Sequence, residues 1–458
     1  MRHIAVIDIG KTNAKILSID LASGEETTLA RAPNAVRHDG PYPHHDAEAL
    51  WAFLRLGLTD LAKGHAVDAI SITTHGAAAA LVDATGALTL PILDYEHSGP
   101  DSLSAAYDAR RPPFAETGAP RLPMGLNLGA QLHWQATLFP EALARTRHIL
   151  TLPQYWSFRL TGVAASEATS LGCHTDLWNP HRRGFSSLVD DMGWRDLFPP
   201  LRRAGDILGP LHPDLAAEIG LAPGIPVLCG IHDSNATLVP WLTGRGPRAI
   251  LSTGTWMIVM ALGGPMVALD PTRDTLINVN ALGEPVPTAR FMAGREFEQI
   301  AGQSADPATA ADEAEVLDRQ IMALPSLHPA TGPFPGQAFA WQGAEPQGGL
   351  RTAAASFYIA LMGASCLSLI GAQGETVIEG PLARNQAFAR MLAATTNRPV
   401  TLAGQGAGTG LGAALLAGPL GKAPTGHSII HPPEDPRWKA YATGWINKVQ
   451  TRGKVQAI

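Results

Sequence analysis

The sequence predicts a protein of two α/β domains, each of which begins with three antiparallel strands and continues with alternating helices and strands. A chain of 458 residues is long for one domain and comfortable for two. The same order of apolar segments opens both halves, near residues 3–9, 13–21, 25–32, 249–252, 255–262 and 276–280. This repetition favours two mixed sheets covered by helices.

In the first half, a helix from about Asp46 to Lys63 and a strand at 67–73 are predicted after the third strand. The pair His44-His45 before Asp46 could suggest a metal site. A turn followed by a helix N-cap suits these residues better.

The second half has a similar predicted order, with helices and strands near 294–301, 352–370, 376–378, after Asn385 and at 400–402. The stretch 244–246 bears glycine and charge next to a proline, which is typical of a domain junction, so we place the domains at 1–246 and 247–458. The Pro- and Gly-rich region 325–349 is predicted to be a long loop. The polar chain after about Pro419 is predicted to be a peripheral extension.

The composition favours an enzyme over a nucleic-acid-binding or membrane protein. A net charge of −6 lacks the basic footprint of nucleic-acid binding. Strand-like residues follow Arg2 at once, so no leader peptide is expected. The apolar stretch 353–371 carries hydroxyl residues and is predicted to be a buried core helix. Three dispersed cysteines, Cys173, Cys229 and Cys366, predict reduced thiols in a cytoplasmic protein.

Residues 4–20 carry the most chemical information. A buried strand ends near Asp8, a tight turn follows, and a second alternating strand begins. Such a hairpin offers backbone amides, a hydroxyl and an ammonium beside a carboxylate, which suits a polyphosphate with its Mg²⁺. The candidates that face phosphates are Gly10, Lys11, Thr12, Asn13 and Lys15. For Lys15, a solvated strand position remains the alternative.

The string Gly10-Lys11-Thr12 imitates the end of a P-loop. That motif needs a glycine where this chain has Ala5, and it needs a following helix. The residues after the turn have the period of a strand instead. The sequence therefore predicts a strand–turn–strand phosphate hairpin.

A second group of motifs lies downstream. An apolar strand at 226–229 leads through Gly230 to His232 and Asp233, and small residues that can start a helix follow. About twenty residues later, a further hairpin is predicted around a tip with two hydroxyls, formed by Thr253, Gly254 and Thr255. Glycine permits close backbone approach to a phosphate, although an ordinary hairpin turn is the alternative.

Taken in order, these motifs resemble the FGGY carbohydrate kinases. Residues 8–13 resemble the first phosphate motif of that family, residues 230–236 the catalytic-base motif, and residues 252–255 the second phosphate motif. The resemblance implies two ribonuclease-H-like domains of the actin-like and sugar kinase superfold, with a central cleft.

Other segments support the resemblance. Residues 151–162 are close to the family signature, residues 166–169 match the segment after it, and residues 379–385 with 404–414 resemble the adenosine-binding region. The resemblance runs from the first residues to about position 418.

A sugar kinase needs a carboxylate that accepts the proton of the attacking hydroxyl. Asp233 is predicted to be this general base, and a helix N-cap is its alternative role. Asp8, with Asp233, is predicted to hold Mg²⁺, usually through water. A turn-forming role is the alternative for Asp8.

The resemblance places the sugar contacts in the first half. His75 and Gly76 follow a buried strand, and the segment 94–97 stands where many relatives have Trp-x-Asp, with Asp94 in place of the tryptophan. Lys11 also stands where small hydroxyl residues are commoner. The predicted sugar contacts are His75, Gly76, Asp94, Glu96, Gln154, His232 and Asp233.

For the nucleotide, Gly380 and Asn385 match the adenosine region, and Gly406 and Gly408 are predicted near the α-phosphate and ribose. The resemblance implies ATP and Mg²⁺ as cofactors. It implies a small-molecule sugar as partner, with no nucleic acid and no membrane, and it leaves a homodimer open.

The predicted function is ATP-dependent phosphorylation of a small ketose. The ketose is a 6-deoxyketohexose such as rhamnulose or fuculose, or a ketopentose such as xylulose or ribulose. Two alternatives stay open: a non-sugar ATPase or acid kinase of the same superfold, and a catalytically inactive sugar-binding regulator.

Overall fold

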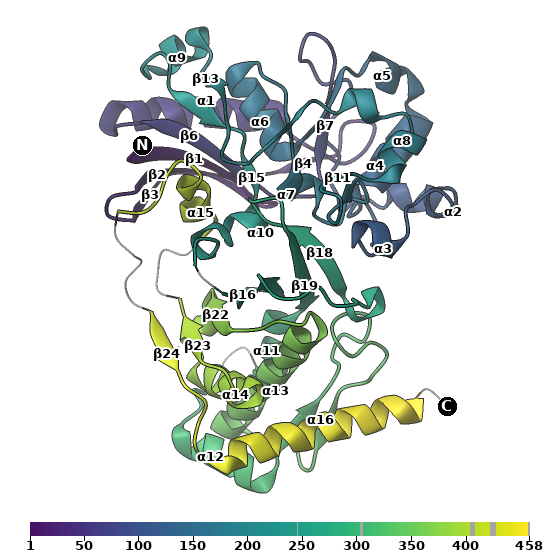
Figure 1. Ribbon diagram of the computed structural model, residues 1–458, viewed down its shortest axis with the longest axis vertical. Helices are drawn as coiled ribbons and strands as arrows, with labels where there is room; N and C mark the ends of the chain where they lie inside the picture. The colour runs from purple at the N-terminus through teal and green to yellow at the C-terminus, as the bar shows by residue number, and fades with distance from the viewer. Residues whose placement is uncertain (245, 303–305, 404–407, 422–426, 457–458) are drawn as a thin grey trace. The chain divides into compact units, whose positions relative to one another are not determined.

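The computed structural model describes residues 1–244, 246–302, 306–403, 408–421 and 427–456, which form two compact units (Figure 1). Unit 1 comprises Met1–Thr243, Ile277–Pro285 and Gly406–Pro424, and unit 2 comprises Gly244–Leu276, Val286–Gln405 and Thr425–Ile458. The chain returns twice to unit 1 after leaving it. A single boundary at residue 246 does not separate the two units, because unit 1 also contains two segments from the second half of the chain.

Unit 1 is built on a seven-stranded mixed sheet of order β13-β14-β6-β1-β2-β3, with β15 paired to β6. Antiparallel pairing joins β1 to β2 and β2 to β3, while β1 and β14 run parallel to β6. The strands are β1 (His3–Ile9), β2 (Asn13–Asp20), β3 (Glu25–Pro33), β6 (Ala69–Thr74), β13 (Ile207–Pro210), β14 (Pro226–Leu228) and β15 (Ile231–His232).

The alternation of side chains along β1 sends apolar residues to both faces of this sheet. Ile4 and Val6 join the core formed with α15 (Thr409–Leu415), whereas Ile7 joins the core formed with α1 (Ala47–Gly64) and α6 (Leu152–Thr161) (Figure 1). Asp8 lies two residues after Val6 and therefore on the same face of β1 as Ile4 and Val6. Its carboxylate therefore lies on the face that α15 covers.

The predicted elements of the first half are confirmed. The helix predicted from Asp46 is α1, and Asp46 is its N-cap, because Asp46 Oδ1 accepts a hydrogen bond from Ala49 N at 3.0 Å. His44 and His45 form the short strand β5 (His44–His45), which pairs with β4 (Val36–Arg37).

The rest of unit 1 forms a mainly helical part with its own apolar core. Its elements, with the smaller helices near the sheet, are β7 (Ala79–Val82), α2 (Ser104–Asp108), α3 (Phe114–Thr117), α4 (Leu128–Leu138), α5 (Pro140–Arg145), β8 (His148–Thr151), β9 (Ser166–Glu167), α7 (Ala168–Leu171), β10 (Trp178–Asn179), β11 (Gly184–Phe185), α8 (Ser187–Asp191), β12 (Leu201–Arg202), α9 (Pro213–Ile219) and α10 (Asp233–Ala236).

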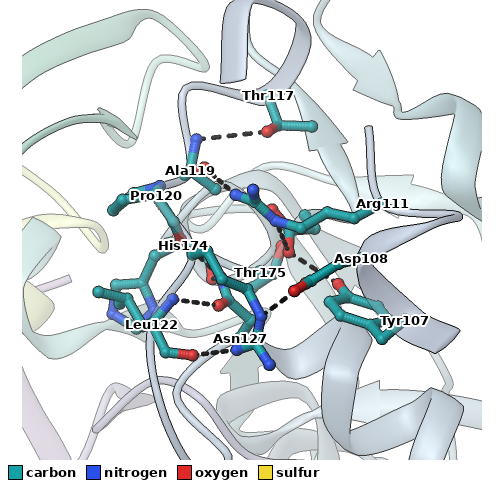
Figure 2. Close-up of polar contacts among 12 residues, drawn as sticks. Tyr107, Asp108, Arg111, Thr117, Ala119, Pro120, Leu122, Asn127, His174 and Thr175 are labelled. Carbon is teal, nitrogen blue, oxygen red and sulfur yellow. Dashed lines mark hydrogen bonds and ion pairs between the residues drawn. The ribbon is translucent and has the colours of Figure 1, made fainter. Parts of the chain in front are cut away.

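A buried polar network holds this part together, as Figure 2 shows around Arg111 and Asn127. Asp176, 1% exposed, accepts hydrogen bonds from Tyr107 Oη at 2.7 Å and from Arg111 Nε at 2.9 Å. Asn127 donates to Pro120 O at 3.0 Å and to His174 O at 2.8 Å (Figure 2). The buried Asp176 is thus paired with a cation, the condition under which an interior charge is tolerated.

Unit 2 is built on a second seven-stranded sheet, of order β18-β19-β17-β16-β22-β23-β24, whose strand β18 continues into the segment Ile277–Pro285 of unit 1. As in unit 1, an antiparallel hairpin (β16 with β17) lies beside a parallel strand (β22). The strands are β16 (Arg248–Thr253), β17 (Met257–Leu262), β18 (Thr275–Val279), β19 (Pro285–Phe291), β22 (Glu375–Glu379), β23 (Val400–Leu402) and β24 (Ser428–Ile430).

Helix α13 (Gly348–Leu369) is the central helix of the unit 2 core. Its length and hydropathy would suffice to cross a membrane, yet 83% of its most apolar window is buried inside the structure. The prediction of a buried core helix is confirmed. The other helices of unit 2, with a small strand pair, are α11 (Ala293–Ala301), α12 (Ala310–Arg319), β20 (Met322–Leu324), β21 (Ala340–Gln342), α14 (Gln386–Thr396) and α16 (Pro436–Gln456).

The prediction that the chain after Pro419 is a peripheral extension is wrong. Strand β24 completes the sheet beside β23, and α16 (yellow in Figure 1) packs Tyr441 and Trp445 into the unit 2 core. Tyr441 Oη donates to Ile321 O at 2.6 Å, and Trp445 Nε1 donates to Ala323 O at 2.6 Å. Both rings are 0% exposed, so α16 is integral to unit 2.

Candidate active site

The turn between β1 and β2 is held in place by hydrogen bonds to its backbone. Gly10 N donates to Asn13 O at 2.8 Å, while Asn34 donates from its side chain to Gly10 O and from its backbone to Thr12 O, each at 2.9 Å. Asn13 Nδ2 donates to Thr12 Oγ1 at 2.8 Å, and Thr12 itself is exposed. The turn is a fixed frame that presents a hydroxyl group outward.

Asp8 and Lys15 face each other across the pair of β1 and β2. Lys15 Nζ lies 3.3 Å from Asp8 Oδ2, and Thr409 Oγ1 donates to the same oxygen at 3.2 Å. Burial raises the pKa of Asp8, Lys15 lowers it, and the charge of Asp233 raises it further. An additional cation beside this carboxylate would therefore stabilise its ionised form.

Lys11 is directed to the segment 94–97 and away from bulk solvent. Its Nζ pairs with Asp94 Oδ1, lies 3.4 Å from Glu96 Oε2, and lies 5.0 Å from the ring centroid of Tyr95. The side chains of Lys11 and Asp94 are 17% and 8% exposed. The structure thus brings the predicted phosphate turn and part of the predicted sugar pocket together through the two ion pairs of one lysine.

His75 offers a buried hydrogen-bond acceptor. Its Nδ1 lies 2.8 Å from Gly76 O, and a carbonyl oxygen only accepts, so Nδ1 carries the proton. Burial lowers the pKa of His75, which keeps the ring neutral and leaves Nε2 unprotonated. His75 Nε2 is buried and has no hydrogen-bond partner among the described residues. A hydroxyl group of a ligand could supply the missing donor.

Asp233 is the first residue of α10, and the N-cap is His232 rather than Asp233. Ser234 N donates to Asp233 Oδ1 at 2.6 Å, Ser234 Oγ lies 3.3 Å from the same oxygen, and His232 Nε2 lies 3.1 Å from it. Oδ2 receives none of these bonds. Burial raises the pKa of Asp233, and His75 lowers it. The side chain nevertheless keeps 28% exposure, as a base that meets a substrate requires.

The proton position on His232 follows from its neighbours. Asn235 Nδ2 lies 3.4 Å from Thr169 O and 3.1 Å from His232 Nδ1, so the amide nitrogen donates to both. Burial lowers the pKa of His232 to about 4. The neutral ring therefore accepts at Nδ1, carries its proton at Nε2 and donates to Asp233 Oδ1. A side chain at Gly76 would place a Cβ 2.7 Å from His232 Nε2, which explains the glycine.

Gln154 lies beneath the strand that leads to Asp233. It is 0% exposed, and its Nε2 donates to Cys229 O and Gly230 O, each at 3.1 Å, while its Oε1 pairs with Thr151. The structure places Gln154 in a supporting position, so its predicted contact with a sugar does not enter our proposal.

The charged groups of unit 1 act on one another as a single site. Burial is the main cause of the shifted pKa values of Asp8, Tyr95 and His75, and the negative charge of Asp233 adds to the raised pKa of Asp8 and Tyr95 and opposes the lowered pKa of His75. Lys11 in turn disfavours the protonated form of His75. Candidates from the phosphate turn, from the segment 94–97 and from the start of α10 are therefore electrostatic neighbours.

Unit 2 carries a cavity of about 670 Å³ between the β16–β17 turn, α11 and the start of α14. The predicted residues Gly254, Thr255 and Asn385 line it, together with Arg295 and Arg384. Neither arginine forms an ion pair with a carboxylate in the part of the chain that the structure describes. The volume is in the range of small-ligand sites, and the free guanidinium groups suit an anion.

Thr253 and Gly380 instead hold the two strand ends at this cavity together. Thr253 Oγ1 donates to Glu379 O at 2.5 Å and accepts from Leu382 N at 3.2 Å. A Cβ at Gly380, where φ is +83°, would lie 2.1 Å from Thr253 O. Asn385 caps α14 through Phe388 N at 3.0 Å. The hydroxyl of Thr253 and the absence of a side chain at Gly380 therefore serve local backbone packing.

The last two predicted nucleotide residues fall in the Gly-rich string after β23. Gly408 is the N-cap of α15 in unit 1, directly before Thr409, whose hydroxyl donates to Asp8. Gly406 lies outside the described residues.

A metal ion here would need ligands from elsewhere. Among the described residues, no group of three or more His, Cys, Asp or Glu side chains is arranged to hold a metal. Mg²⁺ typically takes one or two carboxylates and keeps several waters or substrate phosphates. Asp8 and Asp233 fit that limited role, because the charge of Asp233 contributes to the raised pKa of Asp8 after burial, which places the two carboxylates within electrostatic range of each other.

Sequence reasoning missed several residues of the site. Thr409 stands inside the Gly-rich string, and Arg384 stands inside the adenosine-like segment, so both were within reach. Arg295 carried no motif signal. Glu167 and Thr169, which support His232, occur in the segment 166–169 that resembles the family, so their polar side chains were a signal that the sequence offered.

Comparisons with known proteins agree with this arrangement. The model of the FGGY family of carbohydrate kinases, N-terminal domain, matches residues 3–240, and the model of carbohydrate kinase FGGY, C-terminal domain, matches residues 245–425. A solved structure of a carbohydrate kinase from Novosphingobium aromaticivorans is 36% identical with a TM-score of 0.89, and the match covers 98% of this chain and 99% of that one.

Curated relatives match over part of their length. L-fuculokinase from Salmonella typhi is 27% identical over 273 residues, 57% of each chain. Rhamnulokinase from Enterobacter sp. (strain 638) is 25% identical over 274 residues, 57% of this chain and 53% of that protein. The match thus spans somewhat more than half the length of these relatives.

Proposed function

Because the chain belongs to the FGGY family of carbohydrate kinases, we propose that it transfers the γ-phosphoryl group of ATP to a hydroxyl group of a small ketose. Family membership confirms the resemblance and the two-domain α/β fold that the sequence predicts. Fuculokinase and rhamnulokinase among the relatives support a 6-deoxyketohexose such as fuculose or rhamnulose, with a ketopentose such as xylulose or ribulose as the alternative.

The arrangement of Asp233 carries this proposal. Its Oδ1 is engaged by Ser234 N and by His232 Nε2, which leaves Oδ2 to accept a proton from a substrate hydroxyl. The raised pKa brings the carboxylate closer to the basicity that a general base needs, and it does so through burial. A fixed Oδ1 also orients Oδ2, so little reorganisation is required during proton transfer.

The sugar would be received by acceptors near this base. His75 Nε2 would accept one hydroxyl, and Glu96, the more exposed carboxylate of its segment, would accept another. Asp94 is engaged by Lys11, so we assign it first to holding that lysine and only then to the sugar.

In unit 1, the turn at residues 10–13 and Lys15 would receive phosphate oxygens. In unit 2, the cavity beside Arg295 and Arg384 is our candidate for binding the base and ribose of a nucleotide. Bound Mg²⁺ would neutralise phosphate charge. Asp8 and Asp233 are the residues that would hold it, in part through water. Lys15 lowers the pKa of Asp8 against the effect of burial, and a bound cation would favour the ionised carboxylate further.

The test is a panel of rhamnulose, fuculose, xylulose and ribulose with ATP and Mg²⁺, scored for ADP and sugar phosphate. We expect one ketose to be phosphorylated, and we expect Asp233→Asn to lower kcat by about 10²–10⁴-fold. Asp60→Asn, at an exposed position paired with Lys63, is the control. ATP hydrolysis that no sugar stimulates would favour a non-sugar ATPase, and sugar binding without any product would favour a regulator; either result overturns the proposal.

A further inference from the structure

Glu167 is a buried carboxylate that is absent from the chemistry proposed above. It is 2% exposed and lies at the N-cap of α7. Its Oε1 accepts from Thr169 N at 2.9 Å, and its Oε2 accepts from Thr169 Oγ1 at 2.5 Å and from Ser170 N at 3.3 Å. Burial raises the pKa of Glu167 to about 7, while these three hydrogen bonds favour its ionised form.

The hydroxyl of Thr169 connects Glu167 to His232. Thr169 Oγ1 donates its single proton in the hydrogen bond to Glu167 Oε2. Toward any other partner, this oxygen can therefore only accept. His232 N donates to Thr169 Oγ1 at 3.1 Å. Each oxygen of Glu167 already accepts from a backbone N–H, so Thr169 Oγ1 is the donor to Oε2 and the acceptor for His232 N.

The backbone of Thr169 reaches the His232 ring by a second path. Thr169 O lies 3.4 Å from Asn235 Nδ2, and this amide nitrogen also lies 3.1 Å from His232 Nδ1. The same residue thus contacts the main chain of His232 directly and its imidazole through Asn235. The imidazole Nε2 then lies 3.1 Å from Asp233 Oδ1.

From these contacts we propose that Glu167 and Thr169 are positioning residues for Asp233. Together with Asn235, they fix the backbone of His232 and the tautomer that donates from Nε2 to Asp233 Oδ1, so that Oδ2 stays free. The inference rests on the proposed role of Asp233 as general base. Neither Glu167 nor Thr169 is assigned a contact with substrate.

Substituting Thr169→Val keeps the shape of the side chain and removes both of its hydrogen bonds, while Thr169→Ser keeps them. We expect Thr169→Val to lower kcat by about tenfold or more, because each of the two lost hydrogen bonds is worth up to about tenfold, and we expect KM for ATP to stay within about twofold. Thr169→Ser should restore most of kcat. Thr146→Val is the control, since Thr146 is also buried and donates to its own helix at Ala142 O.

Glu167→Gln tests the direction of the hydrogen bonds, because the new amide group can donate to Thr169 Oγ1 and turn its proton toward His232 N. Nitrogen-15 chemical shifts of His232, read in protein labelled at histidine, report the tautomer without any turnover. We expect Nε2–H in the wild type. In Glu167→Gln and Thr169→Val, His232 N loses its acceptor at Thr169 Oγ1, which shifts the ring relative to Asn235 and Asp233, so we expect a mixed or altered tautomer.

Wild-type kcat in Thr169→Val, or an unchanged His232 tautomer in both variants, would overturn the positioning role. A protein that phosphorylates no ketose would instead overturn the proposed function, and the chemical shifts would still decide on the positioning contacts.

Discussion

Replacing Lys11 by methionine should expose how the phosphate turn and the segment 94–97 depend on each other. Methionine keeps much of the length and apolar volume of the side chain and removes its charge. The carboxylate of Asp94, 8% exposed, would lose its cation, because Glu96 is like-charged and Tyr95 offers only its ring. Lys11→Met therefore leaves a nearly buried carboxylate without a cation among the described residues, with Glu96 N still donating to its Oδ1 at 3.3 Å.

The size of the effect follows from burial. Removing one partner of a fully buried ion pair costs about 3–5 kcal/mol, and since Lys11 keeps 17% exposure we expect about 2–4 kcal/mol for unit 1. For a unit of this size, that corresponds to a fall in Tm of about 5–10 °C. Adding Asp94→Asn to Lys11→Met removes the orphaned charge, so the double variant should recover at least half of the loss.

Thermal unfolding of the two single variants and the double variant gives the coupling energy of the pair. Lys63→Met is the matched control, because its partner Asp60 is exposed to the same extent as itself, 71%, and such pairs contribute about 0.2–1 kcal/mol. Kinetics on the same proteins should show a higher KM for the ketose in Lys11→Met than in the wild type, with a smaller change in KM for ATP. Additive losses of stability, or a change confined to KM for ATP, would refute this account of Lys11.

Four further results are expected. Trp445→Ala should lower the free energy of unfolding of unit 2 by about 3–5 kcal/mol in urea titrations, whereas the same substitution in a peripheral helix would hardly change this free energy. Gly380→Ala should yield little folded protein by circular dichroism, because its Cβ would meet Thr253 O and its φ is positive; a normal Tm would contradict this. Only the ionised form of Asp233 accepts a proton, so kcat/KM should fall as the pH decreases through the pKa of this carboxylate. Burial raises that pKa, so the fall should occur above the usual value of about 3.9, and a flat pH profile would contradict the role of Asp233 as general base. His75→Ala should lower kcat/KM for the preferred ketose and compress the ranking of its epimers, with KM for ATP unchanged, and an unaltered ranking would remove it from the sugar pocket.

Strands and amphipathic helices were accessible from the sequence because their burial follows short, regular patterns. Strands β1, β16 and β17 are short apolar runs bounded by turn residues, β2 alternates buried and partly exposed residues over part of its length, and α1 begins after an Asp that caps it. Helix α16 was missed although Trp438, Tyr441 and Trp445 are spaced three and four residues apart, because the polar residues between them dominate its mean hydropathy.

The candidate site was harder to predict from the sequence, because a motif residue can either contact a ligand itself or support the backbone of residues that contact the ligand. Gln154 and Gly380 both stand in family-like segments, yet the first supports the strand before Asp233 and the second permits close approach to Thr253. The partner of Lys11 is 83 residues away in sequence, so its role could not follow from local pattern. The tautomers of His75 and His232 likewise follow only from three-dimensional neighbours.

The two sheets repeat one arrangement and differ in its chemistry. Strand β1 pairs with β2 and lies parallel to β6, and β16 pairs with β17 and lies parallel to β22. Asp8 is the next-to-last residue of β1 and Ser252 that of β16, and each is followed two residues later by glycine.

The residues paired with these two positions across their hairpins are Lys15 and Ile258. Of these two hairpins, both of which lie within the described residues, only that of unit 1 carries an ion pair of facing side chains, and it is close enough to Asp233 for the charge of Asp233 to affect Asp8. In unit 2, the neutral tip of the hairpin at Thr253, Gly254 and Thr255 lies at a cavity lined by Arg295 and Arg384, which form no ion pair with a carboxylate among the described residues, and this suits a nucleotide whose base and ribose are bound and released unchanged. An ionised hairpin suits the phosphates where charge moves during transfer, which is why we assign the phosphoryl chemistry to unit 1.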